Sequence, residues 1–194
     1  MLLTALITTA ALTTFPVAPP VPTAADTACQ ALPDNVPIEG RKSPLDSITF
    51  SVGKQTVKLC YGRPSSRGRT MLGGSAVPYG KLWRTGANEA TTFSTPVALT
   101  VGGISVPAGT YSLYTVPNAG QWEIIVNRST KQWGEESGYT REVQAQEVGR
   151  AKVKAEAVSQ PVETFTIRSE SAGSGASLIL EWEKIRVRVP VKPA

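Results

Sequence analysis

The sequence of 194 residues contains no histidine, which removes the commonest general base, zinc ligand and pH-sensing side chain. Charged residues make up only 18 %, and beyond the N-terminus no apolar run approaches the length of a transmembrane helix. The two cysteines provide no metal-ligand spacing, and the acidic residues are too scattered to indicate a calcium site. We therefore expect no metal, no cofactor and no membrane span in the mature chain.

The N-terminus has the character of an export signal. Residues 1–12 (MLLTALITTAAL) form an uncharged apolar run too short to span a bilayer, and small residues at 23–25 offer a cleavage site. No Lys or Arg precedes the run, which a start codon further upstream would explain. We predict a signal peptide at 1–25, an extended proline-containing segment at 26–44 and one domain at 45–194. The mature protein is then expected in the periplasm or at the cell surface.

The two cysteines fit an oxidising compartment. Alternation along residues 57–61 puts Val57, Leu59 and Tyr61 on one face of a strand and Cys60 on the more polar face. A disulfide between Cys29 and Cys60 would join the N-terminal segment to this strand. Two alternatives stay open: Cys29 as a lipid-bearing first residue, although Asp26 stands where a leucine-like residue is expected, and two free thiols.

Alternation of apolar and polar residues with a period of two dominates the chain. It predicts short strands separated by turns such as Gly53-Lys54, Gly102-Gly103 and 117–120. The predicted strands are 47–52, 55–61, 97–101, 104–106, 111–116, 122–126, 151–156, 162–168, 177–182 and 185–191. The phase flips at Glu183-Lys184, which indicates a tight turn or a bulge. Only residues 141–148 fit a helix, of one or two turns.

Nine or ten short strands without intervening helices indicate an all-β fold, an antiparallel β-sandwich of which the jelly roll is one form. The strands are interrupted by a long break between Tyr61 and Thr91. Apolar anchors at Leu72, Val77, Tyr79, Leu82 and Trp83 predict that this loop is ordered and packs on the sandwich. Residues 62–90 also hold five basic residues against the single acid Glu89, whereas charges balance closely elsewhere.

Several long motifs resemble those of a bacterial family catalogued as domain of unknown function 2911. They are YGRP at 61–64, GR at 68–69, VPYGKLWRTGANEA at 77–90, PAGTYSLY at 107–114, QWG at 132–134 and LEWE at 180–183. The resemblance spans about residues 45–191, and Gly62 stands where the family more often has Ser. It implies an exported or envelope-associated protein, and brings with it no activity, substrate or catalytic residue.

The first functional hypothesis is a binding module for a small polar or anionic ligand, such as a sugar, a sugar acid or an inorganic anion. Guanidinium groups bind carboxylate, sulfate or phosphate through paired donors, amide and carboxylate groups bind hydroxyls, and an indole offers a stacking face. The candidate ligand-binding residues are Arg63, Arg67, Arg69, Trp83, Arg84, Asn88 and Glu89, with Trp133 as a second stacking candidate. The competing interpretation pairs each arginine within the protein and makes Trp83 the anchor of the loop.

Two other classes of function are weighed against ligand binding. A glycosidase-like hydrolase would use Glu89 as nucleophile or base, with Glu123, Glu135 or Glu136 as the second carboxylate. A salt bridge between Arg84 and Glu89 explains the same residues more simply. The third hypothesis is a structural or protein-interaction module of the cell envelope. Nucleic acid is not an expected partner, because four arginines in one loop do not form an extended basic stripe.

Overall fold

The computed structural model describes residues 28–30 and 37–194, so the predicted signal peptide at 1–25 lies outside the described residues. The fold is all-β, as predicted, with nine antiparallel strands in the order β1-β2-β3-β6-β7-β8-β9-β4-β5. The strands are β1 (Leu45–Val52), β2 (Gln55–Gly62), β3 (Thr91–Thr95), β4 (Leu99–Val101), β5 (Ile104–Val106), β6 (Gly109–Val116), β7 (Gln121–Asn127), β8 (Glu147–Ala172) and β9 (Gly175–Pro193). No helix in the described part of the chain is long and apolar enough to cross a membrane.

The predicted turns join strands as expected. Gly53-Lys54 closes the β1–β2 hairpin, in which Val52 pairs with Gln55. Gly102 and Gly103 close the β4–β5 hairpin with φ angles of +61° and +95°. Both angles lie where side chains other than glycine rarely go, so this turn depends on the Gly-Gly pair.

Two long strands replace four of the predicted short ones. Strand β8 is 26 residues long and pairs first with β7 and then with β9, with register shifts between Ala157 and Thr166. Strand β9 is continuous through Glu183, whose φ of 51° marks the irregularity behind the predicted change of phase. Of the two alternatives predicted at Glu183-Lys184, the bulge is therefore confirmed and the tight turn is wrong.

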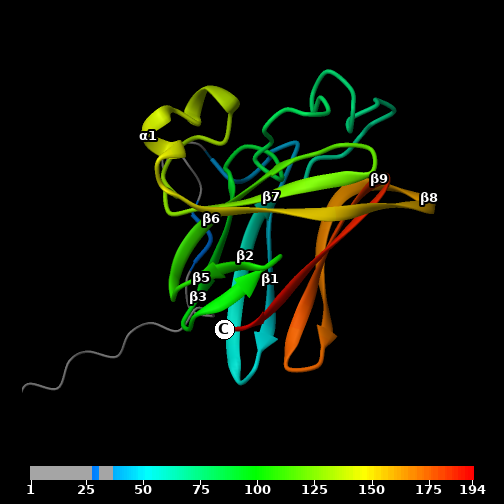
Figure 1. Ribbon diagram of the computed structural model, residues 1–194. Helices are drawn as coiled ribbons and strands as arrows, with labels where there is room; N and C mark the ends of the chain where they lie inside the picture. The colour runs from blue at the N-terminus through cyan, green and yellow to red at the C-terminus, as the bar shows by residue number, and fades with distance from the viewer. Residues whose placement is uncertain (1–27, 31–36) are drawn as a thin grey trace, which may run out of the picture.

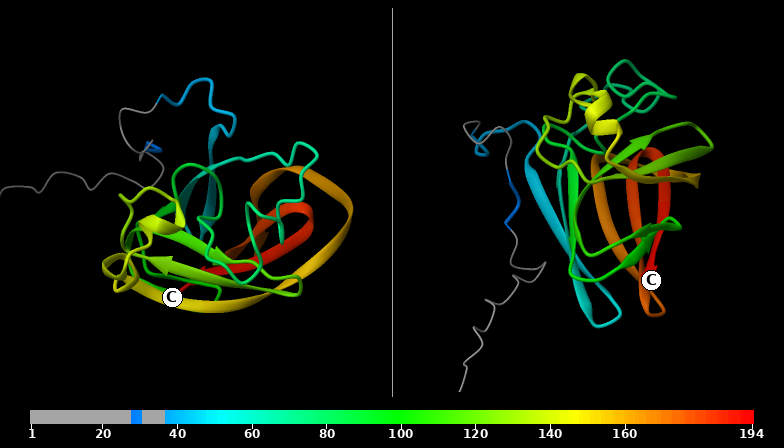
Figure 2. Two further views of the ribbon diagram at one scale, coloured as in Figure 1. Left: turned by 90° about the horizontal axis from the view of Figure 1, so that it is seen from above. Right: turned by 60° about the vertical axis from the view of Figure 1, so that its left-hand side comes forward.

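Because β8 changes partners, the sheet curls until its two halves face each other, as the two views in Figure 2 show. The free edge of β8 then meets the β2 side of the sheet. The backbone N–H of Phe165 donates to the carbonyl of Pro64 at 2.8 Å, and the Tyr61 hydroxyl contacts the backbone N–H and C=O of Ile167. At the opposite end, the N–H of Gly53 donates to the carbonyl of Ser174 at 2.6 Å.

The main core fills the space between the two halves. Strands β2, β7 and β9 all contribute alternating buried side chains, including Leu59, Trp122, Ile124, Leu180 and Trp182. Loop 63–90 covers one end of this core, at the top of Figure 1. Trp83 from the loop is 6 % exposed and stacks on Trp182 with ring centroids 5.7 Å apart.

The apolar residues predicted to anchor the loop divide into two groups. Leu72 and Val77 are buried with Trp83, and Leu82 is partly buried. Tyr79 was expected to dock in the same way, but it is 40 % exposed. Its ring lies over Gly73, where a Cβ atom would come within 2.6 Å of the tyrosine. Tyr79 thus packs within the loop and adds little to the core.

A smaller core lies on the outer face of the sheet. Tyr114 and Ile125 project outward from β6 and β7 and are fully buried by segment 128–146, which includes α1 (Arg141–Gln144). The helix ends before the predicted limit at 148, because residues from Glu147 onward already pair with β7 in strand β8. Segment 128–146 and loop 63–90 lie at the same end of the molecule (Figure 1).

A disulfide joins Cys29 to Cys60, with a Cα–Cα distance of 5.7 Å. This confirms the predicted pairing and rules out the two alternatives for Cys29, namely a free thiol and a lipid-bearing residue with Cys60 unpaired. The bond holds residues 28–30 against the outer face of β2, the polar face that alternation assigned to Cys60.

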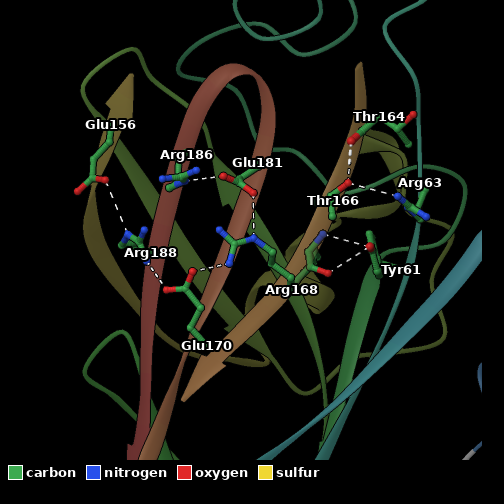
Figure 3. A network of polar contacts seen from close by, with 11 residues as sticks. Tyr61, Arg63, Glu156, Thr164, Thr166, Arg168, Glu170, Glu181, Arg186 and Arg188 are labelled. Carbon is green, nitrogen blue, oxygen red and sulfur yellow. Dashed lines mark hydrogen bonds and ion pairs between the residues drawn. The ribbon is translucent and has the colours of Figure 1, made fainter. Parts of the chain in front are cut away.

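Charged side chains on the outer face of β8 and β9 form a continuous ladder, shown in Figure 3. Glu181 accepts hydrogen bonds from Arg168 and Arg186, and Glu170 accepts from Arg168 and Arg188. Burial alone would raise the pKa of Glu181, but hydrogen bonds from the two arginines outweigh it and leave the pKa below its ordinary value. The ladder joins the two longest strands with alternating charge.

We expect Trp83→Ala to lower the free energy of unfolding by about 3–5 kcal/mol, because it removes a large buried ring from the end of the core. Tyr79→Ala is the matched control, an aromatic of the same loop whose loss should cost less than about 1 kcal/mol. Urea denaturation of both variants measures the difference. Equal losses would contradict the assignment of Trp83 as the anchor.

The lowered pKa of Glu181 predicts a pH dependence of stability. A carboxyl whose folded pKa is depressed stabilises the fold above its unfolded pKa of about 4.3, and this contribution is lost as pH falls through the folded pKa. We expect Glu181→Gln to cost about 1 kcal/mol at pH 7, since both arginines stay partly solvated, and the cost should shrink toward pH 3. Denaturation curves from pH 7 to pH 3 test this. Glu39→Gln, a change at an exposed acid outside the ladder, should leave the pH profile unchanged, and a cost of Glu181→Gln that is constant with pH would refute the prediction.

Candidate functional site

The end of the molecule covered by loop 63–90 is built from two segments that meet there. The backbone of Trp83 pairs with Thr115 of β6 through hydrogen bonds of 2.7 and 2.9 Å. Glu89 forms an isolated bridge with Trp133 of segment 128–146. The two segments therefore form one surface, although more than forty residues separate Glu89 from Trp133 in the chain.

The turn after Trp83 has strained backbone geometry. Thr85 has a φ of 57° and Asn88 a φ of 64°. A positive φ is a genuine outlier for a β-branched residue and costs on the order of 1–3 kcal/mol. Thr85 is fully buried, and its hydroxyl donates to Oγ1 of Thr115 at 3.1 Å, while its carbonyl accepts from the Thr91 hydroxyl at 2.8 Å. Surrounding contacts thus hold the strained turn, which sets the direction of its neighbour Arg84.

Arg84 is half-buried, and its guanidinium makes no hydrogen bond or ion pair with any residue that the structure describes. The Nε atom is buried without an acceptor. Burial lowers the pKa of the Arg84 guanidinium, although the negative charge of Glu135 acts in the opposite direction. The arginine still remains protonated at neutral pH. Buried polar groups are almost always satisfied, so an unpartnered cation here requires a reason.

Gly134 brings the second segment into contact with the stem of Arg84. A Cβ atom at position 134 would lie 2.6 Å from Cδ of Arg84 and 2.6 Å from the carbonyl oxygen of Asn88. Only glycine allows this close approach of the two segments. The packing fixes the aliphatic part of Arg84 and leaves its guanidinium at the surface of a hollow.

The hollow has a volume of about 490 Å³, within the range of small-molecule sites. It is lined by residues from both segments: Ser75, Ala76, Pro78, Lys81, Leu82, Trp83, Arg84, Gly134, Glu135, Glu136 and Ser137. Sequence reasoning named Arg84 and Trp83 but missed Lys81 and Gly134, and considered the two glutamates only as partners of Glu89. The QWG motif at 132–134 contains Gly134, but the sequence alone does not indicate that this glycine packs on Arg84.

The other arginines of the loop point away from this hollow and bind within the protein. Arg63 contacts Asp46 at 3.2 Å and Thr166 at 3.3 Å, although its Nε also lacks a partner. Arg67 donates to the carbonyl of Lys42 at 2.7 Å. Arg69 donates to carbonyls of its own loop, at Ser66 and Ser65. Of the four arginines predicted to bind a ligand, the structure therefore places Arg84 alone at this hollow.

Asn88 and Glu89 hold the segment that precedes β1. The Asn88 amide donates to the carbonyl of Ser43 at 3.1 Å, and Arg41 donates to Glu89 at 2.6 Å with both side chains nearly buried. Glu89 lines a separate hollow of about 230 Å³ under residues 28–30, together with Lys58 and several hydroxyl side chains. Asn88 and Glu89 do not converge with Arg84 on one cavity.

The candidate acids for a hydrolase also lie apart. No second carboxylate from the described residues lines the hollow that Glu89 faces. Glu135 and Glu136 line the Arg84 hollow, and Glu123 forms an ion pair with Arg150 on the outer face. The simpler alternative, a salt bridge between Arg84 and Glu89, is wrong, because Glu89 pairs with Arg41.

The two tryptophans considered as stacking faces have different positions. Trp83 is enclosed by Trp122, Phe165 and Trp182, and its indole N–H donates to the carbonyl of Gly86 at 3.0 Å. Its ring anchors the loop and only borders the hollow. Trp133 is partly buried where its backbone bridges Glu89, and it does not belong to the lining of the Arg84 hollow.

Comparison with known proteins identifies one family. The sequence pattern described as "Protein of unknown function (DUF2911)" matches residues 43–191, which include β1 to β8, all but the last two residues of β9, and both segments of the site. Searches of curated proteins and of solved structures found no match to the chain. Since the family pattern covers most of the sequence, the chain belongs to the DUF2911 family.

Proposed function

We propose that this protein is a binding module for a small polar ligand that carries a carboxylate or another anionic group, held at Arg84. The observation that supports this proposal is the unpartnered guanidinium at the surface of a preformed hollow. Guanidinium groups bind carboxylates through two parallel hydrogen bonds, and such charge-assisted bonds are stronger than neutral ones. A bound anion would supply the acceptors that the described residues do not.

The rigidity of the surroundings also supports binding. The strained Thr85, the close contact at Gly134 and the anchor at Trp83 hold Arg84 in place before a ligand arrives. Preorganised donors bind more tightly because less conformational freedom is lost on binding. Arg67 binds the carbonyl of Lys42 and Arg69 binds carbonyls of the loop, so both contribute to this framework instead of to the ligand.

We further infer that the module works outside the cytoplasm. The Cys29–Cys60 disulfide supports an oxidising compartment, and the apolar N-terminal run has the length of the apolar region of a signal peptide. N-terminal sequencing of the protein purified from the envelope fraction of a bacterial host tests this inference. A mature chain that begins near residue 26 would support export, and an intact Met1 in the cytoplasmic fraction would contradict it.

Binding is tested by a thermal-shift panel of neutral sugars, sugar acids, sulfate and phosphate on the wild type, Arg84→Ala and Arg69→Ala. We expect a stabilising shift from carboxylate-bearing ligands that disappears in Arg84→Ala and persists in Arg69→Ala. Loss of charged hydrogen bonds worth about 1.5–3 kcal/mol corresponds to roughly 10- to 100-fold in affinity. No shift across the panel would favour an interaction module instead.

The stability of the ligand-free protein provides a second test. If Arg84 serves the ligand, then Arg84→Met should leave the melting temperature unchanged or raise it, because an unpaired cation no longer has to be partly buried. If Arg84 serves the fold, the same change should lower the melting temperature clearly. This measurement requires no knowledge of the ligand.

A further inference from the structure

The hollow at Arg84 carries charges of both signs. Lys81 and Arg84 line it together with Glu135 and Glu136. Within residues 28–30 and 37–194, none of these four side chains forms an ion pair or a side-chain hydrogen bond. Two cations and two carboxylates thus line one cavity without forming an ion pair with one another.

Several arginines elsewhere on the surface pair with glutamates. Arg150 is about one-third exposed and contacts both Glu123 and Glu147, at 2.8 and 2.6 Å. Along the ladder in Figure 3, Arg168, Arg186 and Arg188 are similarly exposed, and each contacts at least one glutamate. Arg84 differs from these arginines, because it forms no ion pair with any residue that the structure describes.

The backbone explains how opposite charges stay close without pairing. Gly134 packs directly on the stem of Arg84, and Glu135 is the next residue in the chain. The carbonyls of Glu135 and Glu136 accept hydrogen bonds from Gly138 and Tyr139 at 2.9 and 3.0 Å, which holds this short turn. The carboxylates are near enough for their charge to act on Arg84, yet none lies within ion-pair distance of it.

We infer that the ligand of this hollow is zwitterionic: its carboxylate binds Arg84, and a primary ammonium group binds Glu135 and Glu136. This inference rests on the proposed function and names the class of its ligand. The two glutamates would weaken the binding of a purely anionic ligand to Arg84, whereas they would attract an ammonium group. A volume of about 490 Å³ exceeds that needed for a free amino acid and suits a dipeptide or an amino-sugar acid.

The test compares ligands that differ only in the charge on nitrogen. Isothermal titration calorimetry at pH 7 measures alanylalanine and 2-amino-2-deoxyglucuronate against their N-acetylated forms, which keep the carboxylate and lose the ammonium. The proteins are the wild type, Arg84→Ala, the double variant Glu135→Gln/Glu136→Gln, and Glu39→Gln as a control at an exposed acid outside the hollow. We expect N-acetylation to weaken binding at least tenfold in the wild type and in the control. In the double variant the free and acetylated forms should bind within threefold of each other.

Every result that differs from this expectation overturns the inference, alone or together with the proposed function. Equal binding of free and acetylated forms, lost in Arg84→Ala, would overturn the zwitterion and leave the proposed function standing. The same holds if neither pair binds while another carboxylate does so through Arg84. If no carboxylate binds to the wild type, this inference is wrong. The proposed function is wrong as well if sulfate and phosphate also give no thermal shift. Alanylalanine and 2-amino-2-deoxyglucuronate carry the same two charged groups. Whichever of them binds more tightly indicates whether the ligand derives from a peptide or from a sugar.

Discussion

The packing of Trp83 against Trp182, Trp122 and Phe165 is the contact on which the functional end of this protein depends. A curled sheet with a core between its halves leaves its ends open, and loop 63–90 closes one of them with Trp83 and with the smaller buried side chains of Met71, Leu72 and Val77. Because the indole is buried and its N–H is bound by Gly86, the following residues have little freedom. The strained turn at Thr85 and the position of Arg84 both follow from this anchor.

The curl of the sheet depends in turn on strand β8. This strand pairs with β7 over residues 147–154 and with β9 over residues 155–172, so it passes from one half of the fold to the other. Its free edge is then covered by the Tyr61 hydroxyl and by the backbone near Pro64, which leads directly into the loop. The loop therefore begins at a point where the fold is already closed, and this explains how a long segment with little secondary structure stays ordered.

Charge is used in two different ways on this molecule. On β8 and β9 the arginines and glutamates neutralise one another in a ladder that joins the two longest strands (Figure 3). Around Arg84 the hollow is lined by Lys81, Glu135 and Glu136, and none of these side chains forms an ion pair with a described residue. Charges that pair with each other on the ladder contribute to stability, whereas the charges that line the hollow remain available to a ligand.

The sequence by itself determined the all-β class, most strands and hairpin turns, the disulfide and the family, because alternation and turn residues act over a few neighbouring positions. It also located the loop that closes the end of the sheet. It did not distinguish Arg84 from Arg63, Arg67 and Arg69, since whether an arginine finds a partner depends on residues far away in the chain. Only the tertiary structure brought Gly134, Glu135 and Glu136 to Arg84 and turned Glu89 away toward Arg41. Local patterns determine where strands form, whereas long-range packing determines which residues surround a charged side chain. The site at Arg84 consists of residues brought together by such packing.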